Sequence, residues 1–142
     1  MKNKQKIEEP IFIGAILPLS GKSSIYGKWI QEGLELGKEE INKEGGINGR
    51  RLEIIYEDDS ANPRKARLAM KKLCQKLKVP VVFGSWASSC VSAQIPIAYK
   101  TKTIVLAEAI APKLKKLEVM FLVYNLQLNI TSKSLFLLFT LI

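Results

Sequence analysis

The sequence contains no histidine, and this absence excludes several kinds of catalytic and metal chemistry. A Ser-His-Asp triad and a His-ligated zinc site both require an imidazole. Only two cysteines are present, Cys74 and Cys90, too few for a metal cluster; we expect two buried free thiols, with a disulfide between them as the alternative. No Gly-x-Gly-x-x-Gly motif or phosphate-binding loop occurs. The sequence therefore predicts a protein that is not an enzyme and has no metal site or cofactor.

An uninterrupted apolar run of about 20 residues, the length that crosses a membrane as a helix, is also missing. Residues 119–142 come nearest, with no acid and one base, but polar residues interrupt them at 125, 127, 129 and 131–134. Residues 1–10 start with the positive charge of a secretory signal, yet have neither its apolar centre nor its small-residue cleavage site. We expect these ten residues to be a disordered basic leader and the chain as given to carry no export signal.

Acidic residues are scarce relative to basic ones: 13 Asp and Glu stand against 22 Lys and Arg, a formal net charge of +9. A basic surplus can indicate binding to nucleic acid. Here the lysines are spread along the chain, and the densest basic runs, within residues 64–72 and 113–116, contain no aromatic residues on which bases could stack. We therefore expect solvent-facing lysines on helices and no nucleic-acid partner.

Up to residue 107, short apolar runs alternate with segments in which apolar residues recur at helical spacing. Strands are predicted at residues 11–17, 51–56, 79–83 and 102–107, and helices begin after Ser23 or Ser24, at Asn62-Pro63 and near residue 89. We expect Pro96 to kink or break the last helix. The order β-α-β-α-β-α-β predicts an α/β fold, a doubly wound parallel sheet with helices on both faces.

Two smaller features of this pattern also carry expectations. Gly33 and Gly37 share one face of the first predicted helix, where glycine weakens a helix, so we expect the helix to approach the sheet closely there. Asp58 and Asp59 follow the second predicted strand. We expect them to solvate the loop or to supply charge at a helix N-terminus, not to form a metal-binding pair.

A set of short motifs resembles the type I periplasmic solute-binding proteins of ABC transporters, in particular the branched-chain amino acid and amide branch, the Leu/Ile/Val-binding-protein-like family. No single motif is specific, but their order and spacing together are. They are Leu19-Ser20-Gly21 with Tyr26-Gly27, Ile41-Asn42 with Gly45-Gly46-Ile47-Asn48-Gly49, Tyr56 with Asp58-Asp59, Val82-Phe83-Gly84 with Ser88-Ser89, and Ala109-Ile110-Ala111-Pro112.

The resemblance implies an extracytoplasmic protein whose two lobes close on a small polar solute, an amino acid or amide, and deliver it to an ABC permease. Such proteins are periplasmic, or extracellular and lipid-anchored. This chain would then be an N-terminal fragment: residues 11–116 would form an incomplete N-terminal lobe, and residues 117–142 an atypical apolar tail. Two alternatives remain open, namely a ligand-sensing domain of a receptor or regulator and a truncated product without function.

The resemblance also implies a set of ligand contacts at the ends of the strands: Ser20, Tyr26, Trp86, Ser88, Ala107, Glu108 and Ile110. Simpler roles stand beside some of them. Tyr26 could serve packing alone, Trp86 could pack between loops instead of walling a ligand, and Ser88 could be a helix N-cap.

The fourth loop departs from the pattern of the amino acid binders, because Glu108 stands where a small residue is common and Ile110 where a Thr is common. A carboxylate at this place favours a cationic or amide-bearing solute over a branched-chain amino acid. The alternative is that Glu108 is a solvated surface acid.

We predict that a single-nucleotide frameshift near residues 117–119 produced the tail. After Lys116 the family pattern expects a segment like Tyr-Val-Phe-Arg-x-Gln-Pro-Ser, and a shifted reading of the codons from Val119 onward permits Tyr-Val-Phe-Gly/Ser-Ile-Gln-Pro-Ser-Ala. Sequencing the gene across codon 118 checks this. An alternate frame without a family-like continuation would contradict it.

Overall fold

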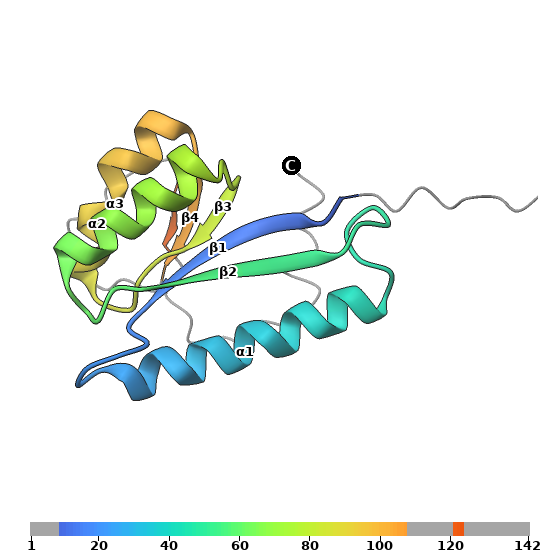
Figure 1. Ribbon diagram of the computed structural model, residues 1–142, viewed down its shortest axis with the longest axis horizontal. Coiled ribbons are helices and arrows are strands. Elements are labelled where there is room, and N and C mark those ends of the chain that lie inside the picture. The colour runs from blue at the N-terminus through green and yellow to red at the C-terminus, as the bar shows by residue number, and fades with distance from the viewer. Residues whose placement is uncertain (1–8, 108–120, 124–142) are drawn as a thin grey trace, which may run out of the picture.

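Parallel strands form one sheet in the order β2-β1-β3-β4-β5 in the computed structural model, which describes residues 9–107 and 121–123 (Figure 1). Strands alternate with helices along the chain up to β4, as predicted. The elements are β1 (Ile11–Leu17), α1 (Ser24–Lys43), β2 (Leu52–Asp58), α2 (Pro63–Lys71) with a π-helical continuation η1 (Lys72–Lys76), β3 (Val81–Phe83), α3 (Ser88–Thr101), β4 (Ile104–Ala107) and β5 (Phe121–Val123).

Strand β1 lies between β2 and β3 and pairs in parallel with both. The register with β2 runs from Ile11 opposite Leu52 to Leu17 opposite Asp58, and on the other side Gly14 lies opposite Val82. The chain therefore leaves β1 in one direction to form β2 and later proceeds in the other direction through β3 and β4. Right-handed crossovers then place α1 on one face and α2 and α3 on the other, as Figure 1 shows. The predicted doubly wound parallel α/β fold is confirmed.

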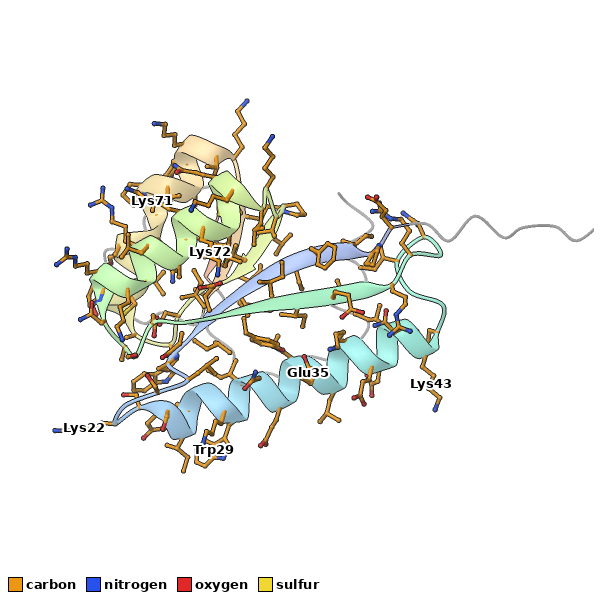
Figure 2. The ribbon with its side chains drawn as sticks, viewed as in Figure 1. Lys22, Trp29, Glu35, Lys43, Lys71 and Lys72 are labelled. Atoms are coloured by element: carbon orange, nitrogen blue, oxygen red, sulfur yellow. The ribbon has the colours of Figure 1, made fainter. Side chains whose placement is uncertain are left out.

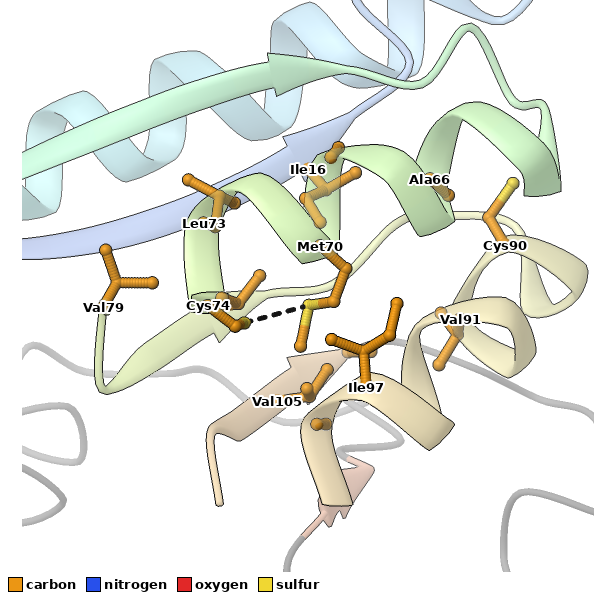
Figure 3. Packing of buried hydrophobic residues seen from close by; sticks show 14 residues of the cluster. Ile16, Ala66, Met70, Leu73, Cys74, Val79, Cys90, Val91, Ile97 and Val105 are labelled. Atoms are coloured by element: carbon orange, nitrogen blue, oxygen red, sulfur yellow. Dashed lines mark hydrogen bonds between the residues drawn. The ribbon is translucent and has the colours of Figure 1, made fainter. Parts of the chain in front are cut away.

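The face under α2 and α3 carries the larger apolar core, shown in Figure 3. Both cysteines are buried there as free thiols, so the expected reduced state is confirmed and the alternative disulfide is absent. They lie at different ends of the packed cluster in Figure 3, with the Cys74 Sγ 3.6 Å from the Met70 Sδ. Burial raises the pKa of both thiols, which makes them poor nucleophiles.

The other face packs against α1 through a smaller cluster that contains Ile13, Ile41 and Leu52. Polar contacts fasten α1 to β2. The Asn42 side chain donates to the Leu52 carbonyl at 2.9 Å and accepts from the Leu52 N–H at 2.7 Å. Nearer the middle of the helix, the Tyr56 hydroxyl donates to Glu35 Oε1 at 2.8 Å (Glu35 is labelled in Figure 2). These contacts set the angle at which α1 runs along β2.

Helix starts follow local sequence closely. The Asn62 side chain accepts hydrogen bonds from the N–H groups of Arg64 and Lys65, and Pro63 occupies the first turn, as predicted for α2. Helix α3 begins one residue earlier than expected and continues through Pro96. Of the expected kink or break, the break is therefore wrong, and the kink stays a prediction. In the described residues no helix is both long and apolar enough to cross a membrane.

The predicted close approach at Gly33 and Gly37 is wrong. Among the described residues no atom other than those of the neighbouring helix backbone lies within 4 Å of the position a Cβ would take at either glycine. The close approach occurs at Gly27, where a Cβ would lie 2.2 Å from the carbonyl oxygen of Pro18. The first turn of α1 is therefore pressed against the segment that leaves β1.

Residues 1–8, 108–120 and 124–142 lie outside the described residues, so most of the expected leader and tail does too. Residues 121–123, which fall in the expected tail, form β5 beside β4, with Val105 opposite Phe121. The boundary at residue 116 stays a prediction.

We predict that Gly27→Ala lowers the free energy of unfolding by about 1–3 kcal/mol, because its methyl group would overlap the Pro18 carbonyl. The matched variant Gly33→Ala, with no described atom near its Cβ, should raise stability by up to about 1 kcal/mol, since alanine favours a helix over glycine. Urea unfolding followed by circular dichroism measures both. Equal effects of the two substitutions would contradict this placement of the helix.

Candidate ligand-binding site

The connections that follow β1 and β3 diverge to opposite faces of the sheet, and the point between them is a topological switch point. Parallel strands end at the same edge of a sheet, so residues 18–23 after β1 and residues 84–87 after β3 come together there. Open α/β sheets bind ligands at this position, because loops and helix N-termini leave a crevice between them. The predicted contacts on the first and third loops thus share one edge.

An aromatic cluster joins these two connections. Tyr26, in the first turn of α1, stacks on Trp86, just before α3, with ring centroids 4.6 Å apart and planes 4° from parallel. Trp29 meets Tyr26 edge to face at 5.9 Å and points away from the sheet in Figure 2. Tyr26 and Trp86 each keep 41% of their surface exposed. Trp86 therefore packs on the first turn of α1 and still presents an aromatic surface to solvent, and its role as a ligand contact stays a prediction.

Ser88 is the first residue of α3, and the N-cap is Ala87, which makes no side-chain capping bond. The alternative that Ser88 itself is the N-cap is therefore wrong. The first paired donors of this helix are the N–H groups of Cys90 and Val91, which both bond to the Ala87 carbonyl. The Ser88 hydroxyl has no hydrogen-bond partner among the described residues, so it and the unpaired N–H groups beside it suit an anionic group.

Ser20 lies in the connection after β1, and its hydroxyl is already engaged. It donates to Asp58 Oδ2 at 2.5 Å and lies 2.7 Å from the Ser60 Oγ. A solute could therefore use only the remaining acceptor capacity of Ser20 without breaking this contact. The role of Ser20 as a ligand contact stays a prediction.

Asp58 is the centre of the polar network at this edge, and sequence reasoning missed it. Its Oδ1 accepts from the N–H groups of Leu19, at 2.8 Å, Ser20, at 3.2 Å, and Ser60, at 2.8 Å, and its Oδ2 accepts from both serine hydroxyls. Partial burial pushes the pKa of this carboxyl upward, but these hydrogen bonds stabilise the charged form more and bring the pKa down to about 2.

Ala107 ends β4 with its side chain buried against the third connection. A Cβ at Gly84 would lie 2.9 Å from the Ala107 Cβ and 3.0 Å from the Gln94 Oε1, so the backbone approaches closely here. Gln94 is fully buried, and its amide atoms have no hydrogen-bond partner among the described residues. Glu108 and Ile110, the remaining predicted contacts, lie outside the described residues.

Metal binding finds no support at this edge. Within residues 9–107 and 121–123, no group of three or more histidine, cysteine, aspartate or glutamate residues could hold a metal ion. The Asp58 oxygens already accept hydrogen bonds from backbone N–H groups and serine hydroxyls of the protein.

An open parallel sheet with polar loops and helix N-termini at its switch point is the arrangement of α/β proteins that bind small molecules. The sequence profile described as periplasmic binding protein matches residues 10–127, and the chain belongs to that family. The match continues past residue 116, where we expected the resemblance to end.

Known members resemble the chain in sequence and in structure. The Leu/Ile/Val-binding protein homolog 2 of Brucella abortus (strain 2308) is 36% identical over 55 residues, which are 39% of this chain and 15% of that relative. LivJ, the substrate-binding protein of a branched-chain amino acid transporter from Streptococcus pneumoniae, was solved with isoleucine. It superposes with a TM-score of 0.75 at 27% identity, over 79% of this chain and 32% of LivJ.

A solute-binding protein of an ABC transporter from R. palustris, solved with benzoate, superposes with a TM-score of 0.63 at 29% identity, over 70% of this chain and 27% of that one. The chain therefore spans about a third or less of the length of each of these relatives.

We predict that the Asp58 carboxyl titrates near pH 2 in the folded chain, well below its ordinary value of 3.8. Because its pKa is lower in the folded state, Asp58 stabilises the fold above about pH 4, and this contribution is lost as the pH falls toward 2. Carbon-detected NMR titration of the carboxyl group measures the midpoint. Ser20→Ala should raise it, because one hydrogen bond to the charged form is removed. A wild-type midpoint near 3.8 would contradict the network.

Proposed function

We propose that this chain supplies one side of the solute site of an extracytoplasmic binding protein that serves an ABC importer, and that the solute carries a carboxylate. The single observation behind this is the meeting of Tyr26 and Trp86 with the N-terminus of α3 at the switch point, in a chain of the periplasmic binding protein family. The ligands named for two similar structures, isoleucine and benzoate, share a carboxylate and little else.

The N-terminus of α3, which follows the third connection, suits a carboxylate group. A carboxylate needs several donors in a place that water does not fill, and a helix N-terminus provides N–H groups and a favourable dipole. Helix α3 offers both, together with the Ser88 hydroxyl. No acidic side chain lies in the first turn of α3 to compete for these donors.

The apolar part of the solute would rest on the aromatic cluster. Trp86 and Tyr26 hold each other in place, so a solute meets a surface that is already ordered, and binding loses less side-chain entropy. Stacked aromatic pairs of this kind contribute about 0.5–1.5 kcal/mol beyond their buried area. A leucine-like or a planar side chain could use this surface.

The fourth connection would decide between an amino acid and a plain carboxylic acid. The resemblance implies solute contacts from Glu108 and Ile110, and a carboxylate at 108 would pair with an ammonium or amide group. This favours amino acids and their amides over benzoate-like acids. The proposed partner is an ABC permease, the proposed place of action is outside the cytoplasm, and the proposed role is transport without catalysis.

We predict saturable binding of an amino acid, such as isoleucine, leucine or glutamine, to the purified chain by isothermal titration calorimetry. Ser88→Ala should weaken it at least about tenfold, since a hydrogen bond to a charged group contributes about 1.5–3 kcal/mol. The matched variant Ser92→Ala removes a hydroxyl one turn further along α3, which donates to the Ser88 carbonyl at 2.9 Å, and should leave affinity unchanged. No binding to folded chain, or equal effects of the two variants, would contradict the proposal.

A further inference from the structure

Asp58 joins two segments that are far apart in the sequence and adjacent at the switch-point edge. Three of its hydrogen bonds come from the connection after β1, namely from the N–H groups of Leu19 and Ser20 and from the Ser20 hydroxyl. Two more come from Ser60 in its own turn. The Ser20 and Ser60 hydroxyls also meet directly, and Lys65 donates to the Ser60 Oγ at 2.9 Å.

The Asp58 carboxylate provides hydrogen-bond acceptors at the point where the backbone pairing of β1 with β2 ends. Leu17 is the last residue of β1 and lies opposite Asp58 in the parallel register. Beyond it, the Leu17 carbonyl accepts from the N–H groups of Leu19 and Asp59, and no strand partner remains for residues 18–20. The next two backbone donors, at Leu19 and Ser20, both reach the Asp58 carboxylate. The side chain therefore extends the pairing of β1 with β2 into the connection.

The connection after β1 is linked to the aromatic cluster through a backbone contact with α1. Pro18 lies directly before Leu19, and its carbonyl is pressed against Gly27 in the first turn of α1. Tyr26 is the neighbour of Gly27, and it stacks on Trp86 across the switch point. A shift of residues 18–20 would therefore move the first turn of α1 and separate the two rings.

We propose that Asp58 is a positioning residue of the solute site, whose carboxylate fixes the connection after β1 so that Tyr26 meets Trp86. That this positioning serves solute binding depends on the proposed function. The positioning itself can be measured without any solute. Asp58 touches neither ring and acts through Leu19, Ser20 and the contact between Pro18 and Gly27.

The test follows the stack by near-UV circular dichroism, which reports aromatic side chains held in fixed packing. The chain has two tryptophans, so Trp29→Phe leaves Trp86 as the only one. In that background Tyr26→Ala defines the signal without the stack. Far-UV circular dichroism and the urea midpoint of each variant show whether the sheet and helices remain.

We predict that Asp58→Ala loses at least half of the signal that Tyr26→Ala removes, while the far-UV spectrum stays unchanged. Asp58→Asn should keep most of it, because the amide oxygen still accepts from the backbone donors and the amide group can donate to the serine hydroxyls. The control Glu44→Gln removes a negative charge at the far end of α1, which makes no side-chain contact with the connection, and should lose nothing.

A wild-type near-UV signal in folded Asp58→Ala would overturn the proposal. Equal losses in Asp58→Ala and Asp58→Asn would overturn it too, because the negative charge and not the geometry would then matter. If Asp58→Ala does not fold, Ser20→Ala combined with Ser60→Ala removes both hydroxyl contacts and leaves β2 intact; a partial loss of signal supports the proposal and an unchanged signal overturns it. Failure to bind an amino acid, with these spectra as predicted, would refute the proposed function alone.

Discussion

The parallel pairing of β1 with β2 on one side and β3 on the other is the constraint on which the rest of the structure depends. It sends α1 to one face of the sheet and α2 and α3 to the other, and it brings the ends of β1 and β3 side by side. The aromatic pair and the N-terminus of α3, on which the proposed function rests, lie beside those ends. The apolar core beneath α2 and α3 keeps the strands in this order, while the polar network around Asp58 and the stack of Tyr26 on Trp86 shape the edge.

Much of the fold could be predicted from local sequence. Apolar runs identified the first four strands, and the pair Asn62-Pro63 located the start of α2, because a capping side chain and a fixed φ act within a few residues. Pro96 does not end α3, which continues through it, so the break that proline allows did not occur. Periodicity also placed Gly33 and Gly37 on one helix face but could not say which backbone passes near which glycine. That depends on Pro18, and only the folded chain brings it against Gly27.

The sequence predicted which loops meet at the candidate site, but it did not predict the hydrogen-bond network there. Resemblance pointed to Tyr26, Trp86 and Ser88, which the structure brings to one edge. Asp58 was expected to solvate the loop or to supply charge at a helix N-terminus, because its partners in the first connection, Leu19 and Ser20, lie 39 and 38 positions away in the sequence. The strand register could have revealed this role of Asp58. Asp58 ends β2 opposite Leu17, the last residue of β1. An acid in that position lies next to the unpaired N–H groups of the connection that follows β1.

The proposed function requires that the connections after β1 and β3 receive a carboxylate-bearing solute. NMR mapping of amide shifts in the labelled chain, during separate titrations with isoleucine and with glutamine, tests this most directly. The largest shifts are expected at the first turn of α3, around Ser88, and at the Trp86 indole. Shifts confined to the outer face of α1, around Leu36, or none in a folded chain at saturating solute, would contradict it.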